Sequence, residues 1–215
     1  MTPTITYDNH FYLYPPRPEN ALHPRFLPTY DNGLYIAEPK LDGDCAVIFT
    51  DGTDTIVRDR HNKPFSKETR ALETIARELH TGKDWCVLVG EYMAKSKKNA
   101  DGQNMNGSLV LFDILVHNGL HLGEYSFKDR HTLLRELYAG EEYDGYIQRG
   151  TLPGLFVVKA FEDGFVDLFE RVTAIQMYEG LVLKKKDAKL ELGIRPMNNH
   201  LTQVKFRRPA KNYHY

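Results

Sequence analysis

Short apolar runs separated by turn-forming residues dominate the hydrophobic pattern of the chain. Runs of this length, bounded by Gly, Pro, Asn or Asp, are typical of β-strands. The pattern predicts strands at residues 34–37, 45–49, 55–58, 85–91, 109–116, 155–161, 181–184 and 202–206. Asp51-Gly52, between the second and third of these runs, is the signal of a hairpin turn.

Apolar residues recur at helical spacing in three other segments. Ser66 can cap a helix with an apolar face formed by Leu72, Ile75, Ala76 and Leu79. Ser126, with Asp129 three residues later, forms a capping box before a second helix. Residues 165–178 carry a third apolar stripe. Strands and helices thus alternate irregularly, which favours an α+β or mixed-sheet fold over a regular parallel sheet.

Two segments follow neither periodicity. Residues 1–33 are rich in proline and aromatic residues, so we expect an extended N-terminal arm packed on the rest of the chain. Residues 93–107 are polar and carry Lys95, Lys97 and Lys98, so we expect a surface loop or a loose hairpin. The length of 215 residues allows one large domain or two small ones, and we expect a single domain over residues 1–215.

Composition places the chain among ordinary globular proteins, with 41% apolar residues, 27% charged residues and a net charge of −1. No apolar window reaches transmembrane length, and residues 1–9 lack the regions of a secretory signal. Cys45 and Cys86 both lie in apolar, strand-like runs, which favours buried thiols in a reducing compartment. We therefore expect a cytoplasmic protein without a membrane partner.

Positive charge gathers toward the C-terminus of this nearly neutral chain. From residue 184 onward there are nine Lys and Arg residues and two acidic residues. Such a segment can follow the phosphates of a nucleic acid, or it can be a solvated basic edge.

Glu38-Pro39-Lys40-Leu41-Asp42-Gly43 places a lysine between an expected strand and a turn. A partly desolvated lysine loses its proton more readily, and its amine can then act as a nucleophile. Glu38 lies two residues before Lys40 and therefore on the same side of an extended chain. By itself, the motif also fits a solvated turn lysine.

Further motifs follow Lys40 in order along the chain. They are Glu91 after an apolar run, Phe112-Asp113-Ile114-Leu115, Glu179-Gly180-Leu181-Val182-Leu183-Lys184 and Gln203-Val204-Lys205-Phe206-Arg207. Over residues 35–207 they resemble the signature motifs of the covalent nucleotidyltransferases, which are the ATP-dependent polynucleotide ligases and the mRNA capping enzymes. The DNA ligase branch is the most similar, on three further elements: Asn118-Gly119, Arg130 before Leu133-Leu134, and Gly193 with Arg195.

The resemblance implies an α+β, two-sheet nucleotidyltransferase fold, an ATP-grasp-like adenylation domain with the nucleotide between the sheets. It implies that Lys40 takes AMP from ATP to form a lysyl–AMP intermediate. Glu38 would accept a hydrogen bond from the adenine amino group, and Phe112 would stack on the adenine ring. Arg60 would contact the ribose and the phosphate of a nick, with Arg58 as the competing choice.

The remaining residues of the motifs would serve the phosphates and a metal ion. Glu91 would hold a ribose hydroxyl or a metal, and Glu179 would bind Mg²⁺ or Mn²⁺, since hard cations prefer carboxylate ligands. Lys205 and Arg207 alternate on a strand and therefore face the same way. There they would act in catalysis by holding the phosphates and offsetting the charge of the leaving pyrophosphate. Lys184 is expected to join them.

Four departures from the family pattern qualify the resemblance. Cys45 replaces an arginine, Asp59 replaces a serine, and Arg207 replaces a second lysine, which keeps the charge and adds a fork. Only eight residues follow Arg207, too few for the five-stranded OB domain that follows this domain in most relatives. The expectation is a minimal ligase or one half of a split enzyme.

Three functional hypotheses remain at this point. The first is a monomeric ATP-dependent DNA ligase that seals nicks in duplex nucleic acid, with DNA favoured over RNA or a hybrid. The second is an RNA ligase of the same superfamily, with a GTP-using capping enzyme behind it. The third is a nucleic-acid-binding accessory without catalysis of its own, or with catalysis that needs a partner chain.

Overall fold

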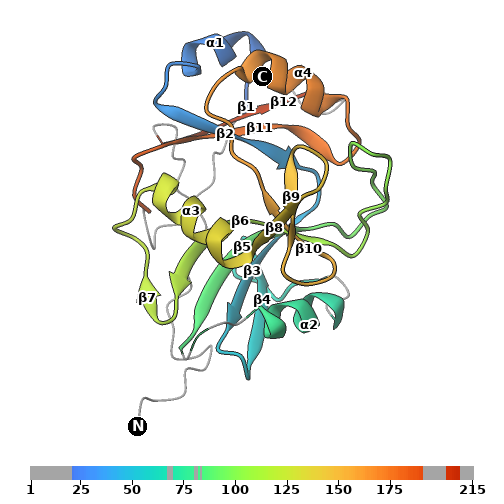
Figure 1. Ribbon diagram of the computed structural model, residues 1–215, viewed down its shortest axis with the longest axis vertical. Helices are drawn as coiled ribbons and strands as arrows, with labels where there is room; N and C mark the ends of the chain where they lie inside the picture. Colours follow the sequence, from blue (N-terminus) through green and yellow to red (C-terminus); the bar gives the residue numbers. More distant parts are fainter. Residues whose placement is uncertain (1–20, 67–69, 80–81, 83, 191–201, 209–215) are drawn as a thin grey trace.

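Two β-sheets organise the chain in the computed structural model, which describes residues 21–66, 70–79, 82, 84–190 and 202–208 (Figure 1). The smaller sheet has the order β1 (Ala21–Leu22), β12 (Gln203–Arg207), β11 (Tyr178–Lys185) and β2 (Tyr35–Leu41). The larger sheet runs β4 (Thr55–Asp59), β3 (Asp44–Thr50), β5 (Cys86–Tyr92), β6 (Leu109–His117), β10 (Leu155–Val158), β9 (Ile147–Gly150) and β8 (Ala139–Glu142), with β7 (Leu120–His121) beside β6.

The chain crosses from the smaller sheet to the larger one at Asp42-Gly43, between β2 and β3. The backbone N–H of Asp42 donates to the carbonyl of Met177 at 2.9 Å, which fixes the start of the crossing. A side chain on Gly43 would place its Cβ 2.7 Å from the carbonyl oxygen of Tyr92. The crossing therefore requires glycine at this position.

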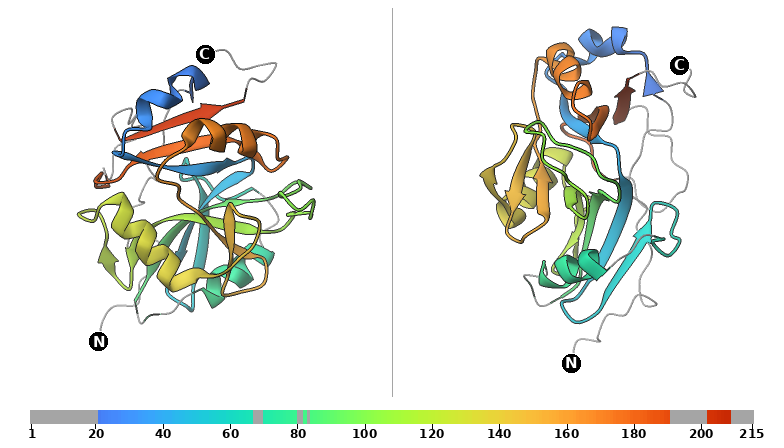
Figure 2. Two further views of the ribbon diagram at one scale, coloured as in Figure 1. Left: turned by 45° about the horizontal axis from the view of Figure 1, so that its top comes forward. Right: turned by 90° about the vertical axis from the view of Figure 1, so that its right-hand side faces the viewer.

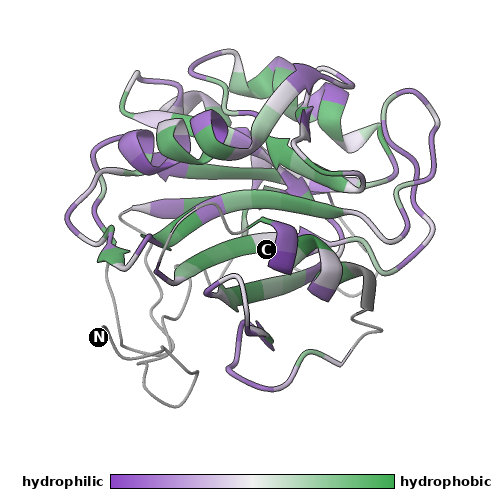
Figure 3. Cartoon of the chain, turned by 60° about the horizontal axis from the view of Figure 1, so that its bottom comes forward, coloured by the Kyte–Doolittle hydropathy of each residue, from purple (hydrophilic) through white to green (hydrophobic). Residues whose placement is uncertain are grey.

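Helices cover the outer faces of both sheets and leave the faces between the sheets for a site (Figure 2). The short η2 (Pro24–Phe26) and α1 (Leu27–Tyr30) lie beside α4 (Phe165–Thr173) at the smaller sheet, whereas α2 (Arg70–Glu78) and α3 (Phe127–Tyr138) pack on the larger one. The strands are mainly hydrophobic, and the connecting loops and outer helix faces are mainly hydrophilic (Figure 3). No helix in the described part of the chain has the length and apolarity needed to cross a membrane.

Alternation along β11 and β12 separates core residues from site residues. Leu181, Leu183, Val204 and Phe206 are buried in one core cluster with the apolar face of α4. The residues between them, Val182, Lys184, Lys205 and Arg207, line a cavity on the opposite face. Side chains in a strand alternate with a period of two, so one face packs in the apolar core and the other lines the cavity.

Most of the strands predicted from the hydrophobic pattern are present, as is the hairpin at Asp51-Gly52 between β3 and β4. The capping box is confirmed: Ser126 caps α3, and its Oγ accepts the backbone N–H of Asp129 at 3.1 Å. Residues 93–107, expected to form a surface loop or a loose hairpin, contain no strand and only an isolated bridge between Lys98 and Asn104. The expected cap at Ser66 precedes residues 67–69, which lie outside the described residues.

Two structural expectations were wrong in detail. The third helix was predicted over residues 165–178, but α4 ends at Thr173 and Tyr178 already begins β11. The apolar residues at its end fit a buried strand as well as a helix, so the periodicity could not separate them. The extended arm predicted for residues 1–33 is helical at η2 and α1, because Pro24 and Pro28 occupy first-turn positions that proline tolerates. Residues 1–20 of that arm lie outside the described residues.

Strand β11 has an irregular pairing with β2 between Tyr178 and Gly180. Strict alternation from Val182 would turn Glu179 into the core, yet Glu179 lines the cavity. The irregularity therefore reverses the direction of this one side chain. Gly180 makes it possible, with φ at +152° and its Cα hydrogen facing the backbone of Phe206.

Replacing Gly180 with alanine should lower the free energy of unfolding by about 3 kcal/mol or more. The new Cβ would lie 1.8 Å from the carbonyl oxygen of Phe206, so β11 and β12 would have to separate. Denaturant unfolding measures the change. Gly102→Ala is the matched control, since Gly102 also has a positive φ of +77° but no atom within 4 Å of the added Cβ. Equal losses in the two variants would contradict the steric explanation.

Candidate active site

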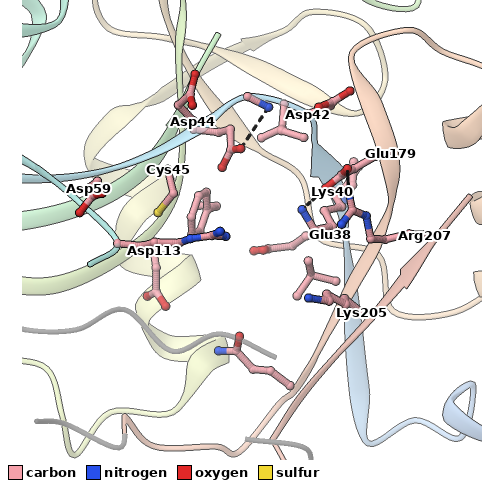
Figure 4. Close-up of a pocket in the computed structure, with 18 of the residues that line it drawn as sticks. Glu38, Lys40, Asp42, Asp44, Cys45, Asp59, Asp113, Glu179, Lys205 and Arg207 are labelled. Atoms are coloured by element: carbon pink, nitrogen blue, oxygen red, sulfur yellow. Dashed lines mark hydrogen bonds and ion pairs between the residues drawn. The ribbon is translucent and has the colours of Figure 1, made fainter. Parts of the chain in front are cut away.

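A cavity of about 660 Å³ lies between the two sheets. The smaller sheet contributes side chains from β2, β11 and β12 to its wall, and the larger sheet contributes residues of β3, β4, β5 and β6. Figure 4 shows Lys40, Lys205 and Arg207 on one side and Cys45, Asp59 and Asp113 on the other. Residues more than 160 positions apart in the sequence therefore meet in one space.

Strand register explains why the motif residues meet. Gly180 of β11 is paired with Lys40 on one side and with Arg207 on the other. Val182 is paired in the same way with Glu38 and Lys205. The two rows place Lys40 and Arg207 on either side of Gly180, and Glu38 and Lys205 on either side of Val182, all on the cavity face. The expectation that Lys205 and Arg207 share a face is confirmed.

Lys40 is held by a carboxylate that also binds a second cation. Its Nζ forms an ion pair with Glu179 Oε1, and Arg207 Nη2 forms an ion pair with the other oxygen, Oε2 (Figure 4). The Lys40 side chain is 23% exposed, so it is neither sealed in the core nor free in solvent. A ligand in the cavity can therefore reach its amine.

Glu91 reaches the same region from the larger sheet. Its Oε1 accepts the backbone N–H of Gly43 at 3.1 Å, which ties the carboxylate to the crossing between the sheets. Burial raises the pKa of Glu91 to about 7, although the charge of Lys40 and the hydrogen bond from Gly43 oppose that rise. The negative charge of Glu179 adds to the rise, which shows that the two carboxylates interact.

Lys205 is a cation in a crowded positive environment. Burial, together with the positive charges of Lys40, Arg207 and Arg60, lowers its pKa to about 8, against an opposing effect of Glu179. An anion placed among these cations would relieve the repulsion. The electrostatics of this end of the cavity therefore favour a polyanionic ligand such as a phosphate chain.

Glu38, Lys184 and Phe112 form another part of the cavity wall. Lys184 Nζ lies 2.7 Å from Glu38 Oε2 and donates to the carbonyl oxygen of Phe112 at 3.2 Å. From the resemblance, Lys184 was expected to hold phosphates together with Lys205 and Arg207. It shares their face, but its ammonium contacts Glu38 instead.

Asp113, the residue after Phe112, is held by Arg130 of helix α3. Arg130 Nε and Nη2 donate to its two carboxylate oxygens at 3.0 and 3.2 Å, and Nη1 donates to the carbonyl of Tyr125. Burial alone would raise the pKa of Asp113, but the Arg130 guanidinium holds it below its usual range. The pair is buried and connects α3 to the strand that carries Phe112.

Arg60 lines the cavity near its open edge, whereas Arg58 is not among the lining residues. Arg60 lies on a turn in which Asp59 Oδ1 accepts the backbone N–H groups of His61 and Lys63, each at 2.8 Å. Cys45 also lines the cavity, and burial raises the pKa of its thiol. Asp59 therefore stabilises this turn, at the position where the ligase pattern has serine.

Three side chains of α3 support the site but were not recognised as site residues from the sequence. All three are buried: Phe127 lies against Lys184, Arg130 holds Asp113, and His131 lies near Glu38. With Leu134 they follow the spacing i, i+3, i+4, i+7 of a buried helix face. Arg130 and His131 are polar residues on this otherwise apolar face. Buried polar groups need partners, so these two residues were the signal in the sequence that α3 contacts polar groups of a site.

The two-sheet fold with lysines, an arginine and carboxylates between the sheets is that of a nucleotidyltransferase. The model of the family described as "ATP dependent DNA ligase domain" matches residues 24–205. The chain belongs to this family. Among curated proteins, none matches the chain in sequence.

Solved structures of ligases share the fold. The ligase domain of LigD from M. tuberculosis superposes with a TM-score of 0.64 and 20% identity, over 94% of this chain and 61% of that one. Mycobacterial DNA ligase D complexed with ATP and MES gives 0.60 and 20%, over 94% and 62%. A Lig E DNA ligase gives 0.54 and 18%, over 90% and 69%. The chain thus spans about three fifths of the two LigD structures, and the expected nucleotidyltransferase fold is confirmed.

Proposed function

We propose that this chain is the adenylylating domain of a ligase that seals breaks in nucleic acid, with DNA as the favoured substrate. The observation that carries the proposal is that Lys40 and Arg207, on one row of the smaller sheet, both form ion pairs with Glu179 inside a cavity large enough for a nucleotide. Family membership gives ATP as the nucleotide.

The first step of the proposed reaction takes place on Lys40. After losing a proton, its amine attacks the α-phosphorus of ATP, the bond to the bridging oxygen breaks, and pyrophosphate leaves. Lys205 and Arg207 would hold the phosphates and offset the charge that develops on pyrophosphate. The product is AMP joined to Lys40 through a phosphorus–nitrogen bond.

Two further transfers would complete sealing. The 5′-phosphate of a broken strand takes AMP from Lys40, and the neighbouring 3′-hydroxyl then attacks the activated phosphate and releases AMP. Arg60, on the turn at the cavity edge, is the candidate contact for the ribose and the 5′-phosphate. In each transfer the chain acts mainly by positioning groups and stabilising charge.

Glu91 and Glu179 are the candidate ligands of a divalent cation such as Mg²⁺ or Mn²⁺. Their carboxylates are the donor type that these cations prefer, and both line the cavity. Within the described residues no group of three or more His, Cys, Asp or Glu side chains could hold a metal alone. This fits a cation shared with nucleotide phosphates, where it would neutralise phosphate charge.

Incubation of the chain with α-labelled ATP and Mg²⁺ tests the proposal. We expect covalent label on the protein, followed by its release and by sealing when nicked duplex DNA is added. A chain that never takes up label would be a binding accessory, or would need a partner, and the proposal would fail. Nicked RNA duplexes offered in parallel separate a DNA ligase from an RNA ligase.

ATP affinity should fall as the pH rises above about 8, where Lys205 begins to lose its proton. Bound phosphates raise the pKa of Lys205, so binding takes up a proton and the affinity is greatest at lower pH. Lys205→Arg should remove this part of the pH dependence, because arginine stays charged. Calorimetric titration from about pH 7 to about pH 10 measures it. Lys189→Arg, at an exposed position paired with Glu124, should keep the wild-type profile.

A further inference from the structure

Glu38 of β2 and Lys184 of β11 form a buried ion pair in the wall of the cavity. Their side chains are only 4% and 5% exposed, and the two charged atoms are 2.7 Å apart. The Lys184 ammonium also donates to the carbonyl of Phe112 and lies 4.4 Å from the centroid of the Phe127 ring. Several partners from β2, β6 and α3 thus fix its position.

The second carboxylate oxygen of Glu38 has no hydrogen-bond partner among the described residues. This atom, Oε1, is buried, while Glu38 itself lines the cavity. His131 Nε2 is 3.8 Å from it but lies 3.1 Å from the carbonyl oxygen of Val158. Because that carbonyl can only accept, Nε2 carries the hydrogen and gives it to Val158. A buried acceptor left without a donor is costly, so a ligand that supplies one is favoured.

We propose that Lys184 is a positioning residue for base selection, which holds Glu38 as a carboxylate whose free oxygen accepts the 6-amino group of a purine. The inference rests on the proposed function, in which the cavity binds a purine nucleotide. A carboxylate can only accept hydrogen bonds, so it attracts a 6-amino group and repels a 6-oxo group. Lys184 thereby acts on the base through Glu38, without contacting the phosphates.

The charges around Glu38 support this assignment. Burial raises the pKa of Glu38 to about 7, and the charge and hydrogen bond of Lys184 are the largest effects that oppose the rise. Asp113 on β6 raises the pKa and Arg130 on α3 lowers it, while His131, whose pKa burial lowers to about 4, stays neutral. Loss of the Lys184 charge and hydrogen bond would raise the pKa of Glu38 further, which favours the protonated carboxyl. Its new O–H could then donate to a 6-oxo group.

Lys184→Met tests the inference, because methionine can fill the space between Phe112 and Phe127 without a charge. The affinities of the full chain for ATP and for inosine triphosphate, which has a 6-oxo group, are compared by calorimetry at about pH 8, above the pKa of Glu38 in the wild-type chain. We expect the preference for ATP to fall roughly tenfold or more. Loss of packing or of a phosphate contact would weaken both nucleotides alike and leave their ratio unchanged, which would overturn the inference.

Two further variants keep the test decisive if Lys184→Met folds poorly. Glu38→Gln should itself reduce the preference, since its amide can also donate a hydrogen bond. Adding Lys184→Met to Glu38→Gln should change the ratio no further, because Lys184 acts through the carboxylate. A further change in the double variant would contradict the inference. If the wild-type chain takes label from ATP and only the ratios fail, the inference is wrong and the proposed function stands; absence of both label and nucleotide binding overturns both.

Discussion

Lys40→Arg should abolish covalent transfer of AMP to the chain while leaving its fold intact. The guanidinium keeps the positive charge that pairs with Glu179, but it does not lose its proton in proteins and cannot act as the nucleophile. Retained ATP binding would separate the loss of chemistry from a loss of the site. The measurement is uptake of α-labelled ATP, with affinity determined in parallel.

Lys128→Arg is the matched control for this change. Lys128 is an exposed residue of α3 and does not line the cavity. This variant should take up label like the wild-type chain. Undiminished labelling of Lys40→Arg would show that another residue is the nucleophile.

Arg130→Met should lower the free energy of unfolding by about 3–5 kcal/mol, because it leaves a buried carboxylate without its partner. The side chains of Arg130 and Asp113 are only 2% and 4% exposed. Since the folded-state pKa of Asp113 is lowered, its contribution is complete above the unfolded pKa and disappears as the pH falls through the folded value. Denaturant unfolding at neutral and acidic pH measures both effects.

Arg77→Met provides the comparison, since Arg77 is an exposed arginine on helix α2. Its replacement should change stability by about 0.5 kcal/mol or less. Adding Asp113→Leu to Arg130→Met should recover much of the loss, because no unpaired charge then remains in the core. A loss at Arg130 no larger than that at Arg77 would show that the buried pair contributes little.

Several features of the site followed directly from sequence patterns. The period of two in β12 predicted that Lys205 and Arg207 share a face, and the register with β11 places both at the cavity. The capping box predicted the start of α3 at Ser126. These features depend on local geometry, which a sequence reports well.

Other features depend on contacts between distant segments. Glu179 faces the cavity only because the irregular pairing at Gly180 interrupts alternation, and the close backbone of Phe206 on another strand leaves no room for a side chain there. The direction of Lys184 followed from its strand, but the strand pattern did not predict that its ammonium would contact Glu38. The short strands β8 and β9 have too few apolar residues to show a period of two. No local pattern contains this information.

Above all, we propose that AMP becomes attached to the side-chain amine of Lys40. Mass mapping of the wild-type chain after incubation with ATP and Mg²⁺ tests it most directly. The account predicts the mass of one AMP added to the peptide that contains Lys40, and its disappearance when pyrophosphate is supplied. AMP found on Lys184, on Lys205 or on a lysine outside the cavity would contradict the account.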